Sequence, residues 1–343
     1  MVPALAVMGM LLPTMPAVAL TAVDPSAPHA GALMHAGPRH QASRPVTMPA
    51  AVSRVTRRRP AASRPAEIAK LGPGNRILGA DISSFQHTAT STFPGGAPID
   101  FHAMYAAGVR FVYIKGSDAY DTADVTAGSW FAADRKAAQA AGLYTGMYHF
   151  AYLPDSTDRT IITTDARAQA LKAVLRVVSA GGLNRRDLAP ALDVETACIR
   201  WSGGVCSASA SPANATLWAL TWLRAVARST GRTPLIYSFP NFLATNMLAD
   251  PELADYPLWI AQPVGQLHAA DSLPGTGSDG TCYLTAWTSW ADCSLRWTAW
   301  QYATASGDDF GVPGSADLDL DVFNGSSRAL RALTAGRRTP AGA

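Results

Sequence analysis

The chain has 343 residues, of which 48% are hydrophobic and 15% are charged, and its formal net charge at pH 7 is +3. This balance allows a sizeable folded core, either as one large barrel or as two smaller domains. Residues 1–75 hold eight Lys or Arg and two acids, which leaves 20 bases and 23 acids for the remainder. The basic character therefore belongs to the N-terminal segment, and we expect no nucleic-acid partner for the folded body.

Residues 1–22 are predicted to be a signal peptide. The run is apolar from residue 2, and Ala17, Val18 and Ala19 fit a small-x-small cleavage site, although no basic residue precedes the run. A membrane anchor is the alternative, but Pro13 and Pro16 interrupt a run that barely reaches the ~20 apolar residues of a span. We expect a secreted, extracellular protein that can remain associated with the cell wall.

Residues 23–75 are rich in Pro, Ala, Ser and Arg and have almost no aromatic residue. Such a segment buries too little apolar surface to offset its ordering entropy, so a disordered linker is predicted. Its basic cluster at residues 57–59 either attaches to an anionic wall or nucleic acid, or is simply solvated, and the solvated interpretation is favoured. Residues 336–343 are predicted to form a flexible tail.

From residue 76 onward, short apolar strands alternate with Ala-rich helical stretches. Five strands, each followed by a helix, are predicted at 77–82, 111–115, 144–151, 188–194 and 235–238. The helices are predicted at 101–107, 130–141, 165–179, 215–229 and 240–248. Three more strands, at 258–261, 298–302 and 318–323, have little helix between them.

Alternating strands and helices imply an α/β fold with a parallel sheet. Eight strands over residues 76–335 suit a closed TIM-like barrel of five βα units followed by three strands, (β/α)5(β)3. A doubly wound open sheet is the second choice. No G-x-G-x-x-G follows the first strand, so no dinucleotide fingerprint supports it.

The four cysteines form two close pairs in loop-like sequence, Cys198 with Cys206 and Cys282 with Cys293. Their even number and short separation predict two local disulfides in an oxidising compartment. A four-thiolate metal site is the alternative, but no C-x-x-C spacing is present, and no metal is predicted.

The most informative acids are Asp193 and Glu195, which end the predicted strand at 188–194. Side chains at i and i+2 leave a strand on the same face, so the two carboxyl groups should lie side by side. They cannot both ionise freely, so one pKa rises, and a carboxyl that stays protonated can serve as a general acid in glycoside cleavage. The alternative is a structural pair of exposed acids at a strand end.

Other acids also fall near strand ends, where an α/β barrel places its chemistry. Asp81 ends the first strand, and Asp317, Asp319 and Asp321 share one face of the last, which neighbours the first in a closed barrel. Rings and polar groups near other strand ends could form a sugar platform: Tyr148, Tyr237, Trp259 and Trp300.

Each of these residues has a structural alternative. Tyr237 and Trp259 could be ordinary barrel packing. Lys115 either neutralises an acid at the barrel mouth or is an exposed strand end. His149 is interpreted as a structural, hydrogen-bonding histidine.

The chain from about residue 78 to 325 resembles glycoside hydrolase family 25, the N-acetylmuramidase type of lysozyme. The matching segments come in the family's order: 79–86 (GADISSFQ), 111–116 (FVYIKG), 142–150 (GLYTGMYHF), 190–195 (PALDVE), 235–238 (LIYS), 258–261 (LWIA), 300–302 (WQY) and 319–325 (DLDVFNG). The resemblance implies the same barrel and hydrolysis of the β-1,4 bond between N-acetylmuramic acid and N-acetylglucosamine in peptidoglycan.

By position, the resemblance implies that Glu195 is the general acid and Asp193 its partner. Asp81 and Asp319 match the aspartates of the first and last strands, and Tyr148 matches a cleft tyrosine. Residues 116–118 (GSD) depart from the family's usual Ala-Thr-Glu, which bears on a contact at the rim. The resemblance leaves open whether the substrate's N-acetyl group or a water attacks the sugar.

We therefore expect a secreted lysozyme that acts on bacterial peptidoglycan as a monomer, without a cofactor, a metal or an obligate protein partner. Two alternatives remain at this point. One is a chitinase-like glycosidase, whose longer D-x-x-D-x-D-x-E pattern is incomplete in residues 187–195. The other is a non-catalytic wall-binding barrel, which the four acids argue against.

Overall fold

The computed structural model describes residues 73–119, 121–263, 274, 282–289 and 293–335. The predicted signal peptide, the predicted linker up to residue 72 and the predicted tail lie outside the described residues. Within the described ranges, no helix combines the length and the apolar character needed to cross a membrane.

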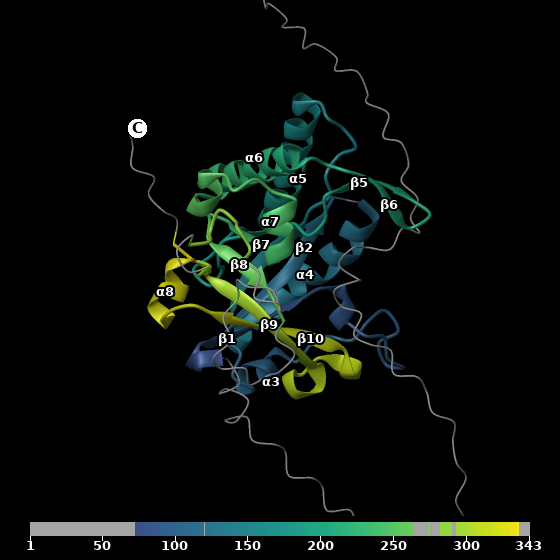
Figure 1. The fold of residues 1–343 in the computed structure, drawn as a ribbon. Helices are drawn as coiled ribbons and strands as arrows, with labels where there is room; N and C mark the ends of the chain where they lie inside the picture. The colour runs from purple at the N-terminus through teal and green to yellow at the C-terminus, as the bar shows by residue number, and fades with distance from the viewer. Residues whose placement is uncertain (1–72, 120, 264–273, 275–281, 290–292, 336–343) are drawn as a thin grey trace, which may run out of the picture.

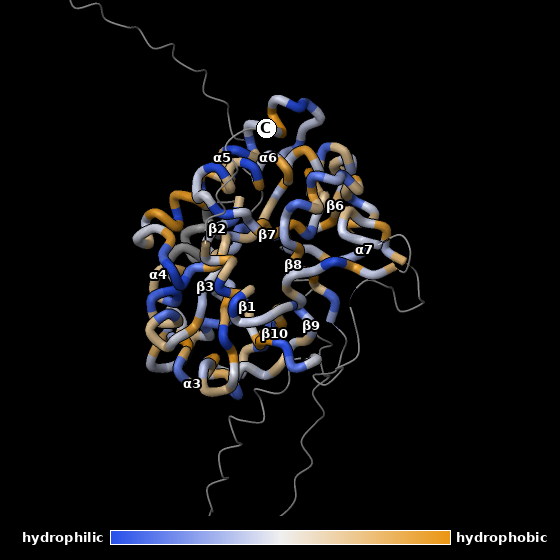
Figure 2. The backbone as a smooth tube through the Cα atoms, turned by 90° about the vertical axis from the view of Figure 1, so that its left-hand side faces the viewer, coloured by the Kyte–Doolittle hydropathy of each residue, from blue (hydrophilic) through white to orange (hydrophobic). Residues whose placement is uncertain are grey.

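Eight strands close into one barrel in the order β1-β10-β9-β8-β7-β4-β3-β2. Figure 2 views the barrel roughly along its axis. Their bounds are β1 (Ile77–Ile82), β2 (Phe111–Asp118), β3 (Tyr144–Phe150), β4 (Ala191–Asp193), β7 (Leu235–Ser238), β8 (Leu258–Ala261), β9 (Ala299–Ser306) and β10 (Asp317–Phe323). The predicted closed α/β barrel is confirmed.

Helices follow β1, β2, β3, β4 and β7, and surround the barrel (Figure 1). They are α3 (Phe101–Ala106), α4 (Asp121–Ala141), α5 (Arg159–Ser179), α6 (Pro212–Thr230) and α7 (Pro240–Thr245), and α8 (Ser327–Ala332) comes after β10. Short 3-10 helices lie at η1 (Pro73–Asn75), η2 (Ser84–Gln86), η3 (Pro251–Asp255), η4 (Gly307–Phe310) and η5 (Pro313–Ser315).

The expectation of an entirely parallel sheet is wrong for β10, which runs antiparallel to both β1 and β9. The reason is the connection from β9, residues 307–316, which holds only the short helices η4 and η5. A parallel crossover needs a dozen or more residues and usually a full helix. The start of β10 therefore lies at the barrel end where the parallel strands finish.

Strand alternation divides the apolar side chains into two layers. Residues such as Ala80, Val112 and Leu192 face outward and pack against the helices. Residues such as Phe111 and Tyr113 face inward and fill the barrel. Inward glycines make room for these rings: a Cβ at Gly79 would lie 2.1 Å from the Phe111 ring.

The helix starts follow from local side-chain chemistry. The Asp158 side chain accepts hydrogen bonds from the first backbone amides of α5, and Ser211 caps α6, whose first residue is proline. These caps satisfy amides that have no partner within the helix. The caps therefore set the residues at which α5 and α6 begin.

Candidate active site

Four acids gather at the barrel end where the parallel strands finish. Asp81 and Asp193 lie near the ends of β1 and β4, and Glu195 follows β4 directly. Asp319 lies near the start of antiparallel β10, where it is the cross-strand partner of Asp81. The last strand sets its three aspartates at different depths, because Asp317 is exposed while Asp319 and Asp321 are buried.

The pKa values of two buried tyrosines are affected by the charges of all four carboxyl groups. Burial raises the pKa of Tyr148 and of Tyr237 well above the ordinary value of 10.0. The negative charges of Asp81, Asp193, Asp319 and Glu195 raise both pKa values further. Since the charges of all four acids act on each tyrosine, the acids that sequence predicted from three separate segments lie around one space.

Asp193 and Glu195 form a coupled pair. Burial raises the pKa of Asp193 well above 3.8, and the charge of Glu195 and a hydrogen bond with its side chain raise it further, against the opposing charge of Lys115. Val194 between them is buried in the outer apolar layer. The predicted alternation of the D-x-E segment is therefore present, and the raised pKa expected for one member of the pair falls on Asp193.

A hydrogen-bonded chain of side chains fixes Asp81. The Tyr237 hydroxyl donates to Gln301 Oε1 at 2.9 Å, and Gln301 Nε2 donates to Asp81 Oδ2 at 2.8 Å. Asp319 Oδ1 accepts a hydrogen bond from Thr304 Oγ1 at 2.8 Å. Sequence reasoning did not select Gln301 or Thr304, although alternation along β9 separates Gln301 from its neighbour Trp300.

The predicted sugar platform is wrong for Trp300. Its side chain is fully buried in the outer apolar layer, and its indole Nε1 donates to the Gln262 carbonyl at 3.0 Å. The alternation that turns Gln301 inward turns Trp300 outward, away from the acids. Trp300 is therefore a core residue of the outer apolar layer.

Trp259 faces inward but is only 2% exposed. Its ring centroid lies 4.5 Å from that of Tyr237 and 4.7 Å from that of Tyr113, and its Nε1 donates to Asp321 Oδ1 at 2.7 Å. The barrel-packing alternative therefore describes Trp259, which supports the Tyr237 ring from inside the barrel.

Lys115 places a positive charge beside the acids. Its Nζ lies 3.2 Å from Asp118 Oδ2 and 5.1 Å from the centroid of the Phe150 ring. Its charge also lowers the pKa of Asp193. Of the two interpretations of Lys115, the structure matches the one in which it balances acids at the barrel mouth.

His149 lies on the outward face of β3, fully buried, and burial lowers its pKa to about 3. Its Nδ1 is 2.8 Å from Ser117 Oγ, and its Nε2 is 3.0 Å from Gln169 Oε1. Because Gln169 Oε1 can only accept, the Nε2 carries the proton and Nδ1 accepts from the serine. A neutral histidine held in this way matches the predicted structural role.

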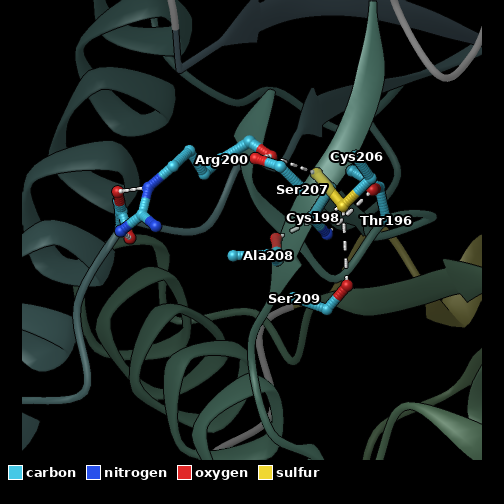
Figure 3. The surroundings of a disulfide bond; sticks show 8 residues. Thr196, Cys198, Arg200, Cys206, Ser207, Ala208 and Ser209 are labelled. Carbon is cyan, nitrogen blue, oxygen red and sulfur yellow. Dashed lines mark hydrogen bonds and ion pairs between the residues drawn. A yellow bond between two sulfur atoms is a disulfide. The ribbon is translucent and has the colours of Figure 1, made fainter. Parts of the chain in front are cut away.

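A disulfide-linked hairpin follows the pair of acids. Strands β5 (Cys198–Ser202) and β6 (Val205–Ser209) pair antiparallel, and Cys198 is bonded to Cys206, as Figure 3 shows. Arg200 Nε lies 2.7 Å from Asp155 Oδ2, which ties the hairpin to the segment between β3 and α5. The second predicted disulfide, Cys282 with Cys293, is also present. Both predicted pairings are confirmed.

The polar side chains at the barrel mouth offer proton donors, proton acceptors and negative charge. Among the described residues, no group of three or more His, Cys, Asp or Glu side chains is arranged to hold a metal ion. The chemistry that this arrangement supports is acid–base work on a neutral substrate that develops positive charge.

The chain resembles known proteins in sequence and in fold. The model of Glycosyl hydrolases family 25 matches residues 80–309. A bacterial lysozyme from Streptomyces coelicolor is 27% identical, with 76% of this chain and 97% of that chain covered and a TM-score of 0.52. A muramidase from Acremonium alcalophilum is 26% identical, with 76% and 100% covered and a TM-score of 0.50.

The chain is also similar to the uncharacterized protein YegX of Escherichia coli O157:H7. The two are 24% identical over 237 residues, which cover 68% of this chain and 66% of YegX. The chain thus spans slightly under two thirds of the length of this curated relative.

Proposed function

The chain belongs to glycosyl hydrolases family 25, and on this premise we propose that it is a lysozyme that degrades bacterial peptidoglycan. The bond we assign to it is the β-1,4 bond between N-acetylmuramic acid and N-acetylglucosamine. The lysozyme and the muramidase that resemble this chain support the assignment.

The observation that carries the proposal is the coupled pair of Asp193 and Glu195 at the barrel mouth. Two interacting carboxyl groups titrate as a unit, and the raised pKa of Asp193 keeps one proton on the pair at a pH where isolated acids have lost theirs. A retained carboxyl proton is what protonation of a glycosidic oxygen requires.

We assign delivery of that proton to Glu195. Glu195 is half-buried whereas Asp193 is 5% exposed, so a glycosidic oxygen can approach Glu195 more readily. The proton passes to the leaving oxygen as the bond between that oxygen and the sugar's anomeric carbon breaks. Both carboxylates are then charged and face the developing positive charge, with Asp81 and Asp319 adding to the negative field.

Water completes the hydrolysis by one of two routes. It attacks the anomeric carbon directly, with Asp193 orienting it, or it opens a ring that the substrate's own N-acetyl oxygen has formed. Direct attack inverts the anomeric configuration, whereas the substrate-assisted route retains it. Proton NMR of the first products from a soluble peptidoglycan fragment distinguishes the two.

The proposed test is Glu195→Gln in the full chain, assayed on purified peptidoglycan. Loss of the general acid should lower turnover by about 10²- to 10⁴-fold while the melting temperature stays near that of the wild type. Analysis of new reducing ends should find muramic acid for the wild-type enzyme. Near-normal lysis by the variant would reject the assignment, and preferential cleavage of chitin would favour the chitinase-like alternative.

We also propose that the protein acts outside the cell. Disulfides persist in oxidising compartments, and the structure holds two. Peptidoglycan lies in the same compartment. All the side chains assigned above come from one chain, which is consistent with action as a monomer.

A further inference from the structure

A cleft lies at the barrel end opposite to the acids. Its volume is about 460 Å³, and it is notable for four arginines among its lining residues. They are Arg76, Arg110, Arg186 and Arg331. Among the described residues that line this cleft there is no Asp or Glu. A cleft with four guanidinium groups and no lining carboxylate attracts anions.

The topology places these arginines together. Arg76 and Arg110 immediately precede β1 and β2, Arg186 precedes β4, and Arg331 lies on α8 after antiparallel β10. All four therefore belong to the end at which the parallel strands begin, whereas Asp81, Asp193 and Glu195 belong to the end at which they finish. An occupant of this cleft would not compete with a glycan at the acids.

Aromatic rings lie against three of the guanidinium groups. Arg110 lies 4.2 Å from the Tyr105 ring centroid, Arg186 lies 5.6 Å from that of Tyr144, and Arg76 lies 5.1 Å from that of Trp297. Rings orient a guanidinium without cancelling its charge.

Backbone carbonyls complete this support. Arg110 Nη1 donates to the carbonyls of Tyr105 and Val109 at 2.8 Å each, and Arg186 Nη1 donates to the Gly142 carbonyl at 2.7 Å. The guanidinium groups of Arg110 and Arg186 each have five N–H donors, so further donors remain for a ligand. The cleft is thus a preorganised set of positive charges.

We propose that this cleft binds the phosphodiester backbone of an anionic cell-wall polymer. Guanidinium donors match the paired oxygens of a phosphate group. Four arginines around one cleft exceed what a single phosphate can engage, which favours a ligand with repeated charges. The inference uses the proposed function only to expect that the protein meets such polymers in the wall.

The test compares two double variants of the full chain with equal loss of charge. Arg110→Gln with Arg331→Gln removes charge from the cleft, and Arg167→Gln with Arg228→Gln removes it from exposed positions on α5 and α6. Binding is measured to a soluble glycerol-phosphate polymer over a range of salt concentrations. Binding is also measured by sedimentation with walls before and after hydrofluoric acid, which removes phosphodiester polymers.

The cleft variant should bind the soluble polymer about tenfold more weakly and with a shallower salt dependence, while the control stays near wild type. Wild-type protein should sediment less with acid-treated walls than with untreated walls. Equal losses in both double variants, or undiminished binding to acid-treated walls, would overturn the proposal.

Two controls separate this inference from the lysozyme assignment and from misfolding. Hydrolysis of a short soluble peptidoglycan fragment should be the same in both double variants, because the acids lie at the other end of the barrel. Absence of that activity in the wild type would reject the lysozyme assignment and leave the binding result intact. If the cleft double variant melts early, Arg331→Gln alone should still weaken polymer binding about threefold, and unchanged binding there would also overturn the proposal.

Discussion

Asp193 and Glu195 titrate together because each raises the cost of charging the other in a buried space. A substitution at either position therefore changes the chemistry of both. Removing one charge should relieve the repulsion that holds the shared proton, even where the remaining carboxyl group is untouched.

We predict that Asp193→Asn lowers kcat and moves the alkaline limb of the pH profile to lower pH. The pair in the wild type gives up its proton as pH rises through a raised pKa, and without the Asp193 charge Glu195 should lose its proton sooner. The measurement is kcat/KM against pH on a soluble fragment. Asp317→Asn, at the exposed aspartate of β10, is the matched control and should leave the profile unchanged. An alkaline limb that stays in place in Asp193→Asn would contradict the coupling.

Adjacent residues on β9 provide a second test, because Gln301 faces the acids and Trp300 lies in the outer apolar layer. Gln301→Leu breaks the link from Tyr237 to Asp81 and should lower kcat/KM by roughly 10- to 100-fold. Trp300→Phe loses a buried hydrogen bond and packing, and should lower the free energy of unfolding by about 1–3 kcal/mol with kcat/KM unchanged. Kinetics and urea denaturation of both variants decide. The opposite pattern would mean that the two faces of β9 are wrongly assigned.

At the scale of elements, hydrophobic runs were sufficient to locate the barrel strands. The predicted bounds of β1, β7 and β8 match the structure. The family resemblance is confirmed by the family match over residues 80–309. The hydrophobic pattern does not predict strand direction, because an apolar run looks the same in a parallel and in an antiparallel strand. Only the short connection over residues 307–316 could have shown that β10 turns back.

The hairpin of β5 and β6 was missed although its turn carried a signal. Gly203 and Gly204 both have positive φ, at 57° and 78°, as a two-residue hairpin turn with this twist requires. The flanking strands are short and partly exposed, so they lack the apolar alternation that revealed the barrel strands. The cysteine pair was recognised, but a disulfide alone does not distinguish a loop from a hairpin.

That hairpin supports a prediction about the Cys198–Cys206 bond. Replacing both cysteines with serine should lower the free energy of unfolding by at most about 2–3 kcal/mol, because the bond closes a short loop. It should also speed hydrogen exchange in residues 198–209 and lower kcat/KM, since the hairpin begins three residues after Glu195. Hydrogen exchange with mass spectrometry measures the opening. The matched control replaces Cys282 and Cys293. Unchanged exchange in the hairpin would show that its strands hold without the bond.

On the scale of the whole molecule, the functional residues at one end of the barrel could be predicted from the sequence, whereas those at the other end could not. The acids could be found because strand ends point to the chemistry of an α/β barrel. The arginine cleft draws on residues 76, 110, 186 and 331, which no motif connects. These positions meet only after the barrel closes and β10 returns the chain to the end where β1 begins.

The pH dependence of the free energy of unfolding should include a contribution from His149. Burial lowers its folded-state pKa to about 3, against an ordinary value of 6.5. Between these values the unfolded chain holds a proton on this residue that the folded protein does not. The free energy of unfolding therefore rises with pH up to 6.5, and this contribution to stability is lost as pH falls. The effect of this one group is at most about 5 kcal/mol across the range.

We predict that His149→Gln flattens this dependence, because glutamine does not titrate and can still hydrogen-bond Ser117 and Gln169. The difference between wild type and variant isolates this group from the buried acids. Asp321, whose pKa burial raises, acts with the opposite sign, since its contribution is lost as pH rises through its folded pKa. Urea denaturation at several pH values between 4 and 8 gives the two curves. The free energy of unfolding of the wild type minus that of the variant should increase with pH up to about 6.5 and stay constant above it. Curves that stay parallel below pH 6.5 would mean that His149 is protonated in the folded protein, against its hydrogen bonds to Ser117 and Gln169.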